Sequence, residues 1–267
     1  MNGSFPTPAL PVTLNQSRFP LLELLHPRRF GWRVLLSLAL GLVAGTGLVL
    51  LTGIDRWMGT ALVILVLLPV AAAKFREDRR LFGATVMLLS LLLTAQGGHT
   101  VEHVVQWLQY YLLGWPIRQA NGLLSAANVE WVHFVWNWGV LLAIIGLMRG
   151  GMRNGWAWLL LGVAVGHTIE HSYLLVRHYQ VLAELRQMGI AGVTAQGLPG
   201  ILGQDGWLAR SPLTRNSFLC RAPGLTTANR IDVHFWWNVL EMGMLIPAGH
   251  YFLKRQLSSQ EKEGRRF

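Results

Sequence analysis

The chain has 267 residues, of which 52% are hydrophobic and only 13% are charged. Soluble domains usually carry about 25% charged residues, so this composition excludes an ordinary soluble globular protein. The formal net charge is +10, but Lys and Arg stand in short stretches beside apolar segments, which is typical of membrane topology signals rather than of a nucleic-acid-binding surface. Cys220 is the one cysteine, which excludes an internal disulfide framework and a cysteine-based metal site.

Apolar segments recur along the chain at lengths that suit a bilayer, whose hydrocarbon core is crossed by about 20 helical residues. They predict an all-α integral membrane protein with six transmembrane helices, at residues 34–53, 57–73, 81–113, 131–148, 156–179 and 231–253. The first and the fifth contain Gly-x-x-x-Gly pairs, which allow helices to approach closely. These pairs are Gly41 with Gly45 and Gly162 with Gly166.

Basic residues are distributed unevenly between alternate connections, and this predicts the orientation. They precede the first predicted helix, follow the sixth, and fill the short turns after the second and the fourth. We therefore expect both termini in the cytoplasm, with residues 1–33 as an N-terminal segment, 34–253 as the membrane domain and 254–267 as a basic tail. Residues 180–230 are then expected to form an outer loop.

Two sequence motifs recur in the same order. The hexamer GHTVEH at 98–103 returns as GHTIEH at 166–171, with one conservative difference. A second hexamer, VHFVWN at 132–137, returns as VHFWWN at 233–238. Because two separate motifs recur in one order, chance is a poor explanation and an internal duplication is indicated.

The duplication pairs the third and fourth predicted helices with the fifth and sixth. We expect a parallel repeat, with repeat A at 81–148 and repeat B at 156–253, related by a pseudo-two-fold axis along the membrane normal. With a rise of about 1.5 Å per residue, the histidines of all four helices fall in the outer half of the bilayer.

The repeated motifs place polar side chains on common helical faces, because positions i, i+3 and i+4 share one face. Polar groups at membrane depth are costly unless they face the interior of the bundle. The predicted metal ligands are His99, Glu102, His103, His133, His167, Glu170, His171 and His234. Glu102 and Glu170 are also candidate catalytic groups for proton transfer. Asn137, Asn238 and Glu241 lie on the same faces and are expected to support the ligands through hydrogen bonds.

These groups divide by symmetry into two sites, each with three histidines and one glutamate. The sequence therefore predicts two transition-metal ions. Imidazole suits iron, copper, zinc and nickel, and a carboxylate shifts the balance toward iron, manganese or zinc. Iron is favoured, and copper and zinc stay open.

The pattern predicts a dinuclear His/Glu metal centre near the outer side of the bundle, in an oxidoreductase that acts on a lipophilic small molecule. A b-type cytochrome is one alternative, because histidines on facing helices can ligate haem. A zinc-dependent membrane hydrolase with glutamate as base is a second, and a metal transporter is a third. The lipid bilayer is the expected partner and nucleic acid is not, and the sequence identifies no electron donor.

Overall fold

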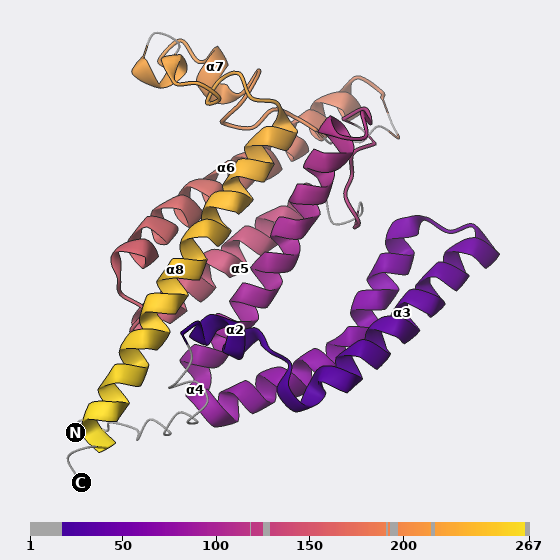
Figure 1. Cartoon of the computed structure of the whole chain (residues 1–267). Helices are drawn as coiled ribbons and strands as arrows, with labels where there is room; N and C mark the ends of the chain where they lie inside the picture. The colour runs from indigo at the N-terminus through magenta and orange to yellow at the C-terminus, as the bar shows by residue number, and fades with distance from the viewer. Residues whose placement is uncertain are drawn as a thin grey trace. The chain divides into compact units, whose positions relative to one another are not determined.

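A computed structural model describes residues 18–117, 119–124, 129–190, 192, 197–214 and 217–264 (Figure 1). Side chains are described as far as Gln256, apart from that of residue 219. Most of the predicted N-terminal segment and the last part of the basic tail therefore lie outside the described residues. Within the described part, every regular element is a helix: α2 (Pro20–Leu25), η1 (Arg28–Phe30), α3 (Gly31–Thr52), α4 (Arg56–Tyr111), α5 (Glu130–Arg149), α6 (Gly155–Gln187), α7 (Trp207–Arg210), η3 (Phe218–Arg221) and α8 (Arg230–Gly264).

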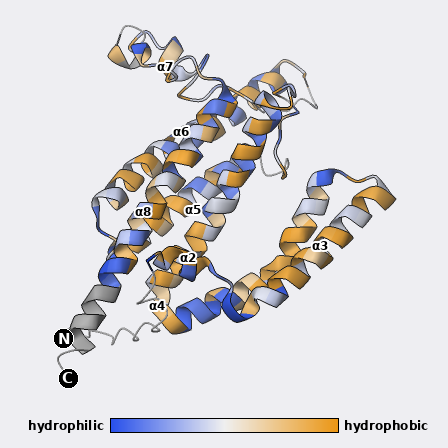
Figure 2. Cartoon of the chain, in the orientation of Figure 1, coloured by the Kyte–Doolittle hydropathy of each residue, from blue (hydrophilic) through white to orange (hydrophobic). Residues whose placement is uncertain are grey.

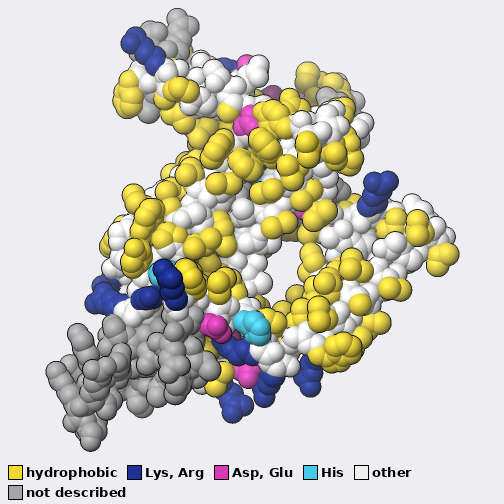
Figure 3. All heavy atoms as spheres, viewed as in Figure 1, with side chains coloured by type: hydrophobic (Ala, Val, Ile, Leu, Met, Phe, Trp, Pro, Cys, Tyr) yellow, Lys and Arg dark blue, Asp and Glu magenta, His cyan; other side chains and the backbone are white. Residues whose placement is uncertain are grey.

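Four helical stretches are long and apolar enough to cross a membrane, judged by length and composition: Arg28–Thr52, Arg56–Tyr111, Glu130–Arg149 and Gly155–Gln187. Figure 2 shows hydrophobic residues along most of α3, and its large apolar side chains face outward, with Leu50 78% and Leu51 88% exposed. On the face drawn in Figure 3, hydrophobic side chains are widespread and Lys and Arg occur in a few small groups. Such a surface suits lipid better than water.

The second and third predicted helices are two parts of one element. Helix α4 continues through residues 74–80, where a turn is predicted between the second and third helices. It is interrupted at Gly83, whose φ of 84° and ψ of 173° are not helical. The charged stretch stays helical because none of its residues is a glycine or proline, and Lys74 pairs with Asp78 one turn later. Gly83 adopts the positive φ at no steric cost.

The sixth predicted helix corresponds to α8, which is not among the four apolar stretches. The reason lies in its own sequence. His234, Asn238 and Glu241 interrupt the apolar residues in the first half of α8 and lower its mean hydropathy. The polar residues of the candidate site thus lower the hydropathy by which α8 would be recognised as a membrane-crossing helix.

The chain divides into two compact units. The first contains Met1–Gly98, Ala143–Leu160 and Met242–Phe267, and the second contains His99–Leu142 and Leu161–Glu241. Every predicted site residue belongs to the second unit.

In the first unit, helices α3 and α4 meet through glycines. A Cβ atom on Gly45 would lie 2.6 Å from the carbonyl oxygen of Gly59, and one on Gly41 would lie 3.0 Å from the Cα of Val63. The close approach predicted for this glycine pair is confirmed. The other pair behaves differently, because Gly162 has open space beside it and Gly166 faces the ring of Trp237.

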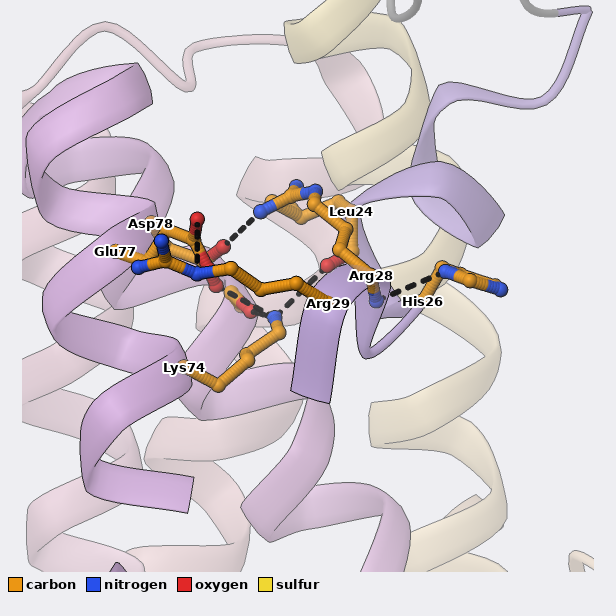
Figure 4. Close-up of polar contacts among 8 residues, drawn as sticks. Leu24, His26, Arg28, Arg29, Lys74, Glu77 and Asp78 are labelled. Carbon is orange, nitrogen blue, oxygen red and sulfur yellow. Dashed lines mark hydrogen bonds and ion pairs between the residues drawn. The ribbon is translucent and has the colours of Figure 1, made fainter. Parts of the chain in front are cut away.

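A buried ion cluster joins α2 to two turns of α4 (Figure 4). The Lys74 ammonium donates to Asp78 at 2.5 Å, to Ser90 at 2.5 Å and to the Leu24 carbonyl at 2.8 Å. Arg28 donates to the second oxygen of Asp78 at 2.7 Å. Lys74 belongs to the basic residues expected in the short turn after the second predicted helix. In the structure it is buried, and its three donors are all used.

Candidate metal centre

Four helices of the second unit bring six histidines together. His99 and His103 come from α4, His133 from α5, His167 and His171 from α6, and His234 from α8. Five of the six are buried and His99 is half-buried. We call these six residues the histidine cluster.

The rings of the cluster form one connected group. Ring centroids lie 4.6 Å apart for His99 and His103 and 4.9 Å apart for His167 and His171. His133 stacks on His171 at 5.0 Å with an interplanar angle of 9°. His234 lies 5.1 Å from His171 and 5.6 Å from His103, so it links the two pairs.

Three of these histidines present ring nitrogens at a spacing that suits one ion. The ligand atoms of His99, His103 and His133 all lie within 4.8 Å of one another. The Nε2 atoms of His99 and His103 are 3.3 Å apart. Two imidazole nitrogens bound to one tetrahedral ion at about 2.0–2.1 Å would be about 3.3 Å apart, so this pair needs little adjustment to share a metal.

Outer hydrogen bonds fix the orientation of three rings. Nδ1 of His103 lies 2.8 Å from the Gln106 side-chain oxygen, and Nδ1 of His167 lies 2.9 Å from a Glu241 carboxylate oxygen. Nδ1 of His234 lies 2.8 Å from the Arg230 carbonyl. Each partner offers an acceptor oxygen, which favours the neutral tautomer with the proton on Nδ1 and the lone pair on Nε2. Metal-binding histidines are commonly held in this way.

The remaining ring nitrogens include several that are buried and unpaired. Among the described residues, both nitrogens of His133, both of His171 and Nε2 of His167 have no hydrogen-bond partner. Each buried donor or acceptor left unsatisfied costs about 1–3 kcal/mol. A metal ion bound by the lone pairs would remove part of this cost, so the donor set fits a transition metal.

The two glutamates of the hexamers have other partners. Glu102 accepts backbone N–H groups from Leu123 and Leu124, at 2.8 and 2.9 Å. Glu170 accepts those of Ile201 and Leu202, at 3.0 and 3.3 Å. The structure thus brings the six predicted histidine ligands together and places both predicted glutamate ligands against loop backbone.

The amides and the tryptophans of the second motif lie around the cluster. Asn137 donates to the carbonyl of His133 and Asn238 to that of His234, both at 2.9 Å. Trp136 lies 4.9 Å from His99 and Trp237 stacks on His167 at 5.2 Å, measured between ring centroids. Through these hydrogen bonds the two asparagines support the helical backbone at His133 and His234, not the imidazole rings.

Sequence reasoning missed three kinds of partner. Gln106 lies three residues after His103 on the same helical face, so helical spacing could have revealed it. The Arg230 carbonyl and the loop N–H groups that bind the glutamates are backbone groups, for which the sequence offers no signal. Arg230 itself, four residues before His234, donates to the Glu130 carboxylate at 2.5 Å and to the Leu198 carbonyl at 2.6 Å.

Comparison of the chain with protein-family models, with curated proteins and with solved structures gives no match.

Proposed function

We propose that the protein is a membrane metalloprotein whose histidine cluster binds two transition-metal ions. The observation that carries this proposal is the convergence of six imidazoles with unpaired buried nitrogens at His133, His167 and His171. Packing alone would favour apolar side chains at these positions, because buried polar groups without partners are costly. Six imidazoles would provide three for each ion, and one such set, His99, His103 and His133, has its ligand atoms within 4.8 Å of one another.

We also propose that repeats A and B are duplicated halves. Matching contacts support this. In each half, the two histidines of the first motif pair at 4.6 or 4.9 Å, and a tryptophan of the second motif lies against one of them. In each half, an asparagine binds the carbonyl of its histidine and a glutamate binds two successive loop N–H groups.

For the membrane arrangement, we propose six spans, counting α4 as two across Gly83 and adding α8. Both termini would then be cytoplasmic, and the cluster would lie toward the outer face. The excess of basic residues at the opposite ends of the helices supports this orientation.

For the activity, we propose an oxidoreductase that acts on a lipophilic substrate. The exposed apolar helix surfaces support a substrate that arrives from lipid. Both oxygens of Glu102 and of Glu170 accept loop N–H groups, which favours a role in holding the loops over that of a base in a zinc hydrolase. Iron, copper and zinc all accept imidazole, and the choice depends on whether the carboxylates are ligands.

The test is elemental analysis with an optical spectrum on detergent-purified protein. We expect about two equivalents of iron or copper per chain, without a Soret band, and loss of the metal in a His103→Ala/His171→Ala variant. His178→Ala is the control, because His178 lies on α6 but its ring contacts Tyr179 outside the cluster. A Soret band would assign the protein to the cytochromes. Metal-free protein that folds equally well with both substitutions would overturn the proposal.

A further inference from the structure

Each hexamer glutamate holds a loop by two consecutive backbone N–H groups. The bonds from Leu123 and Leu124 reach different oxygens of Glu102, and those from Ile201 and Leu202 reach different oxygens of Glu170. Both carboxylates are buried. A buried carboxylate that accepts two N–H groups forms strong, charge-assisted bonds, so each loop segment is fastened at two adjacent points.

A glycine stands beside each of these carboxylates. A Cβ atom on Gly122 or on Gly200 would collide with the Oε1 atom of Glu102 or of Glu170, respectively. Gly122 also has a φ of 74°, which side-chain-bearing residues rarely adopt. The two loops are therefore shaped to bring the backbone directly onto the carboxylate, and a larger residue at either position would push it away.

Other side chains hold the same loops. Gln109 donates to the Gly122 carbonyl at 3.2 Å and accepts its N–H at 2.8 Å. Arg230 donates to the Leu198 carbonyl at 2.6 Å. The two loops are thus held by hydrogen bonds from side chains of α4 and α8, two of the helices that carry the histidines.

We propose that Glu102 and Glu170 are positioning residues that clamp segments 122–124 and 200–202, and that imidazole alone holds the ions. This inference rests on the proposed metal centre. It is supported by the ligand geometry of the first repeat, where the ligand atoms of His99, His103 and His133 lie within 4.8 Å of one another without Glu102. For the second repeat, the support is that both oxygens of Glu170 accept loop N–H groups, as those of Glu102 do.

The inference changes the expected metal. The preference for iron came from counting two carboxylates among the ligands. Without carboxylate ligands, that argument for iron is removed. Copper is then expected at equal free concentrations, because the affinity of a given site for divalent ions rises from iron to copper.

Two sets of variants separate a clamp from a ligand. Glu102→Gln/Glu170→Gln removes the charge and one acceptor from each clamp. Gly122→Ala/Gly200→Ala displaces the loops and leaves both carboxylates intact. The matched controls are Gly189→Ala, which has the same φ of 74° as Gly122, and Gly155→Ala, because neither glycine has an atom within 4 Å of its added Cβ.

The measurements are hydrogen–deuterium exchange of peptides covering Leu123, Leu124, Ile201 and Leu202, and metal content after separate dialysis against cupric or ferrous ions. We expect these backbone N–H groups to exchange about 10- to 100-fold faster in both double variants, because each double variant loses strong hydrogen bonds at the loops. In the controls we expect exchange to be unchanged. Metal content in both double variants should stay at the wild-type value for each ion, because the proposed ligands are unchanged.

Unchanged exchange in both double variants would overturn the clamp. If the Glu→Gln variant loses metal while the Gly→Ala variant keeps it, the carboxylates are ligands and the proposal is overturned. Wild-type protein that binds neither ion would instead remove the metal centre, and the exchange rates would still decide the clamp.

Discussion

His167 and Glu241 form a buried pair on two helices of the second unit, with Nδ1 and the carboxylate oxygen 2.9 Å apart and side-chain exposures of 0% and 1%. A carboxylate in this position makes the ring a better donor to a metal, because it shares the Nδ1 proton while Nε2 binds. The pair matches the role expected for Glu241 from its spacing on α8.

We predict that Glu241→Gln weakens metal binding by about 10- to 100-fold, the range typical of such outer partners. Competition with a chelator of known affinity measures this change. Glu184→Gln is the control, since Glu184 is exposed on α6. Equal affinity in wild type and Glu241→Gln would mean that the pair serves folding alone.

At the residue scale, helical spacing placed six histidines on faces that the structure brings into one cluster, because i, i+3 and i+4 positions point the same way whatever the tertiary fold. The same spacing placed Glu102 and Glu170 with them. Their actual partners are loop N–H groups at 123–124 and 201–202. Loop backbone geometry has no periodicity in sequence, so these bonds could not be predicted.

At the level of elements, the contact between α3 and α4 depends on glycine. The Cβ of an alanine at position 45 would lie 2.6 Å from the Gly59 carbonyl oxygen, whereas one at position 47 would have nothing within 4 Å. Two backbones in such contact must separate to admit even one methyl group.

We predict that Gly45→Ala destabilises the protein by about 1–3 kcal/mol, the usual cost of overpacking. Gly47→Ala should be neutral or stabilising, because alanine is the better helix former. Thermal unfolding of both variants in the same detergent gives the comparison. Similar melting temperatures for the two variants would show that α3 and α4 do not depend on this contact.

Helix boundaries were predicted with uneven success. The fourth predicted helix, 131–148, agrees closely with α5, because polar residues and glycines end its apolar run sharply. The turn expected at 74–80 was wrong, because charged residues signal polarity but do not end a helix. The break lies at Gly83, where the backbone needs a positive φ.

For the whole molecule, composition alone indicated a helical protein with apolar surfaces, and four long apolar helices agree with this. The orientation is a proposal that one experiment tests. In a Cys220→Ser background, we predict that a membrane-impermeant maleimide labels Leu213→Cys on intact cells, because Leu213 is 87% exposed in the proposed outer loop. Arg79→Cys, on the proposed inner side, should react only after permeabilisation. The reverse pattern would invert the topology and place the cluster toward the cytoplasm.

The most direct test of the metal centre is X-ray absorption at the metal edge of the purified full-length protein. We predict scattering from about three imidazoles per ion at about 2.0–2.1 Å, the distance of metal–imidazole bonds. Absence of a stoichiometric metal, or a bound metal surrounded by oxygen with no imidazole signal, would contradict it.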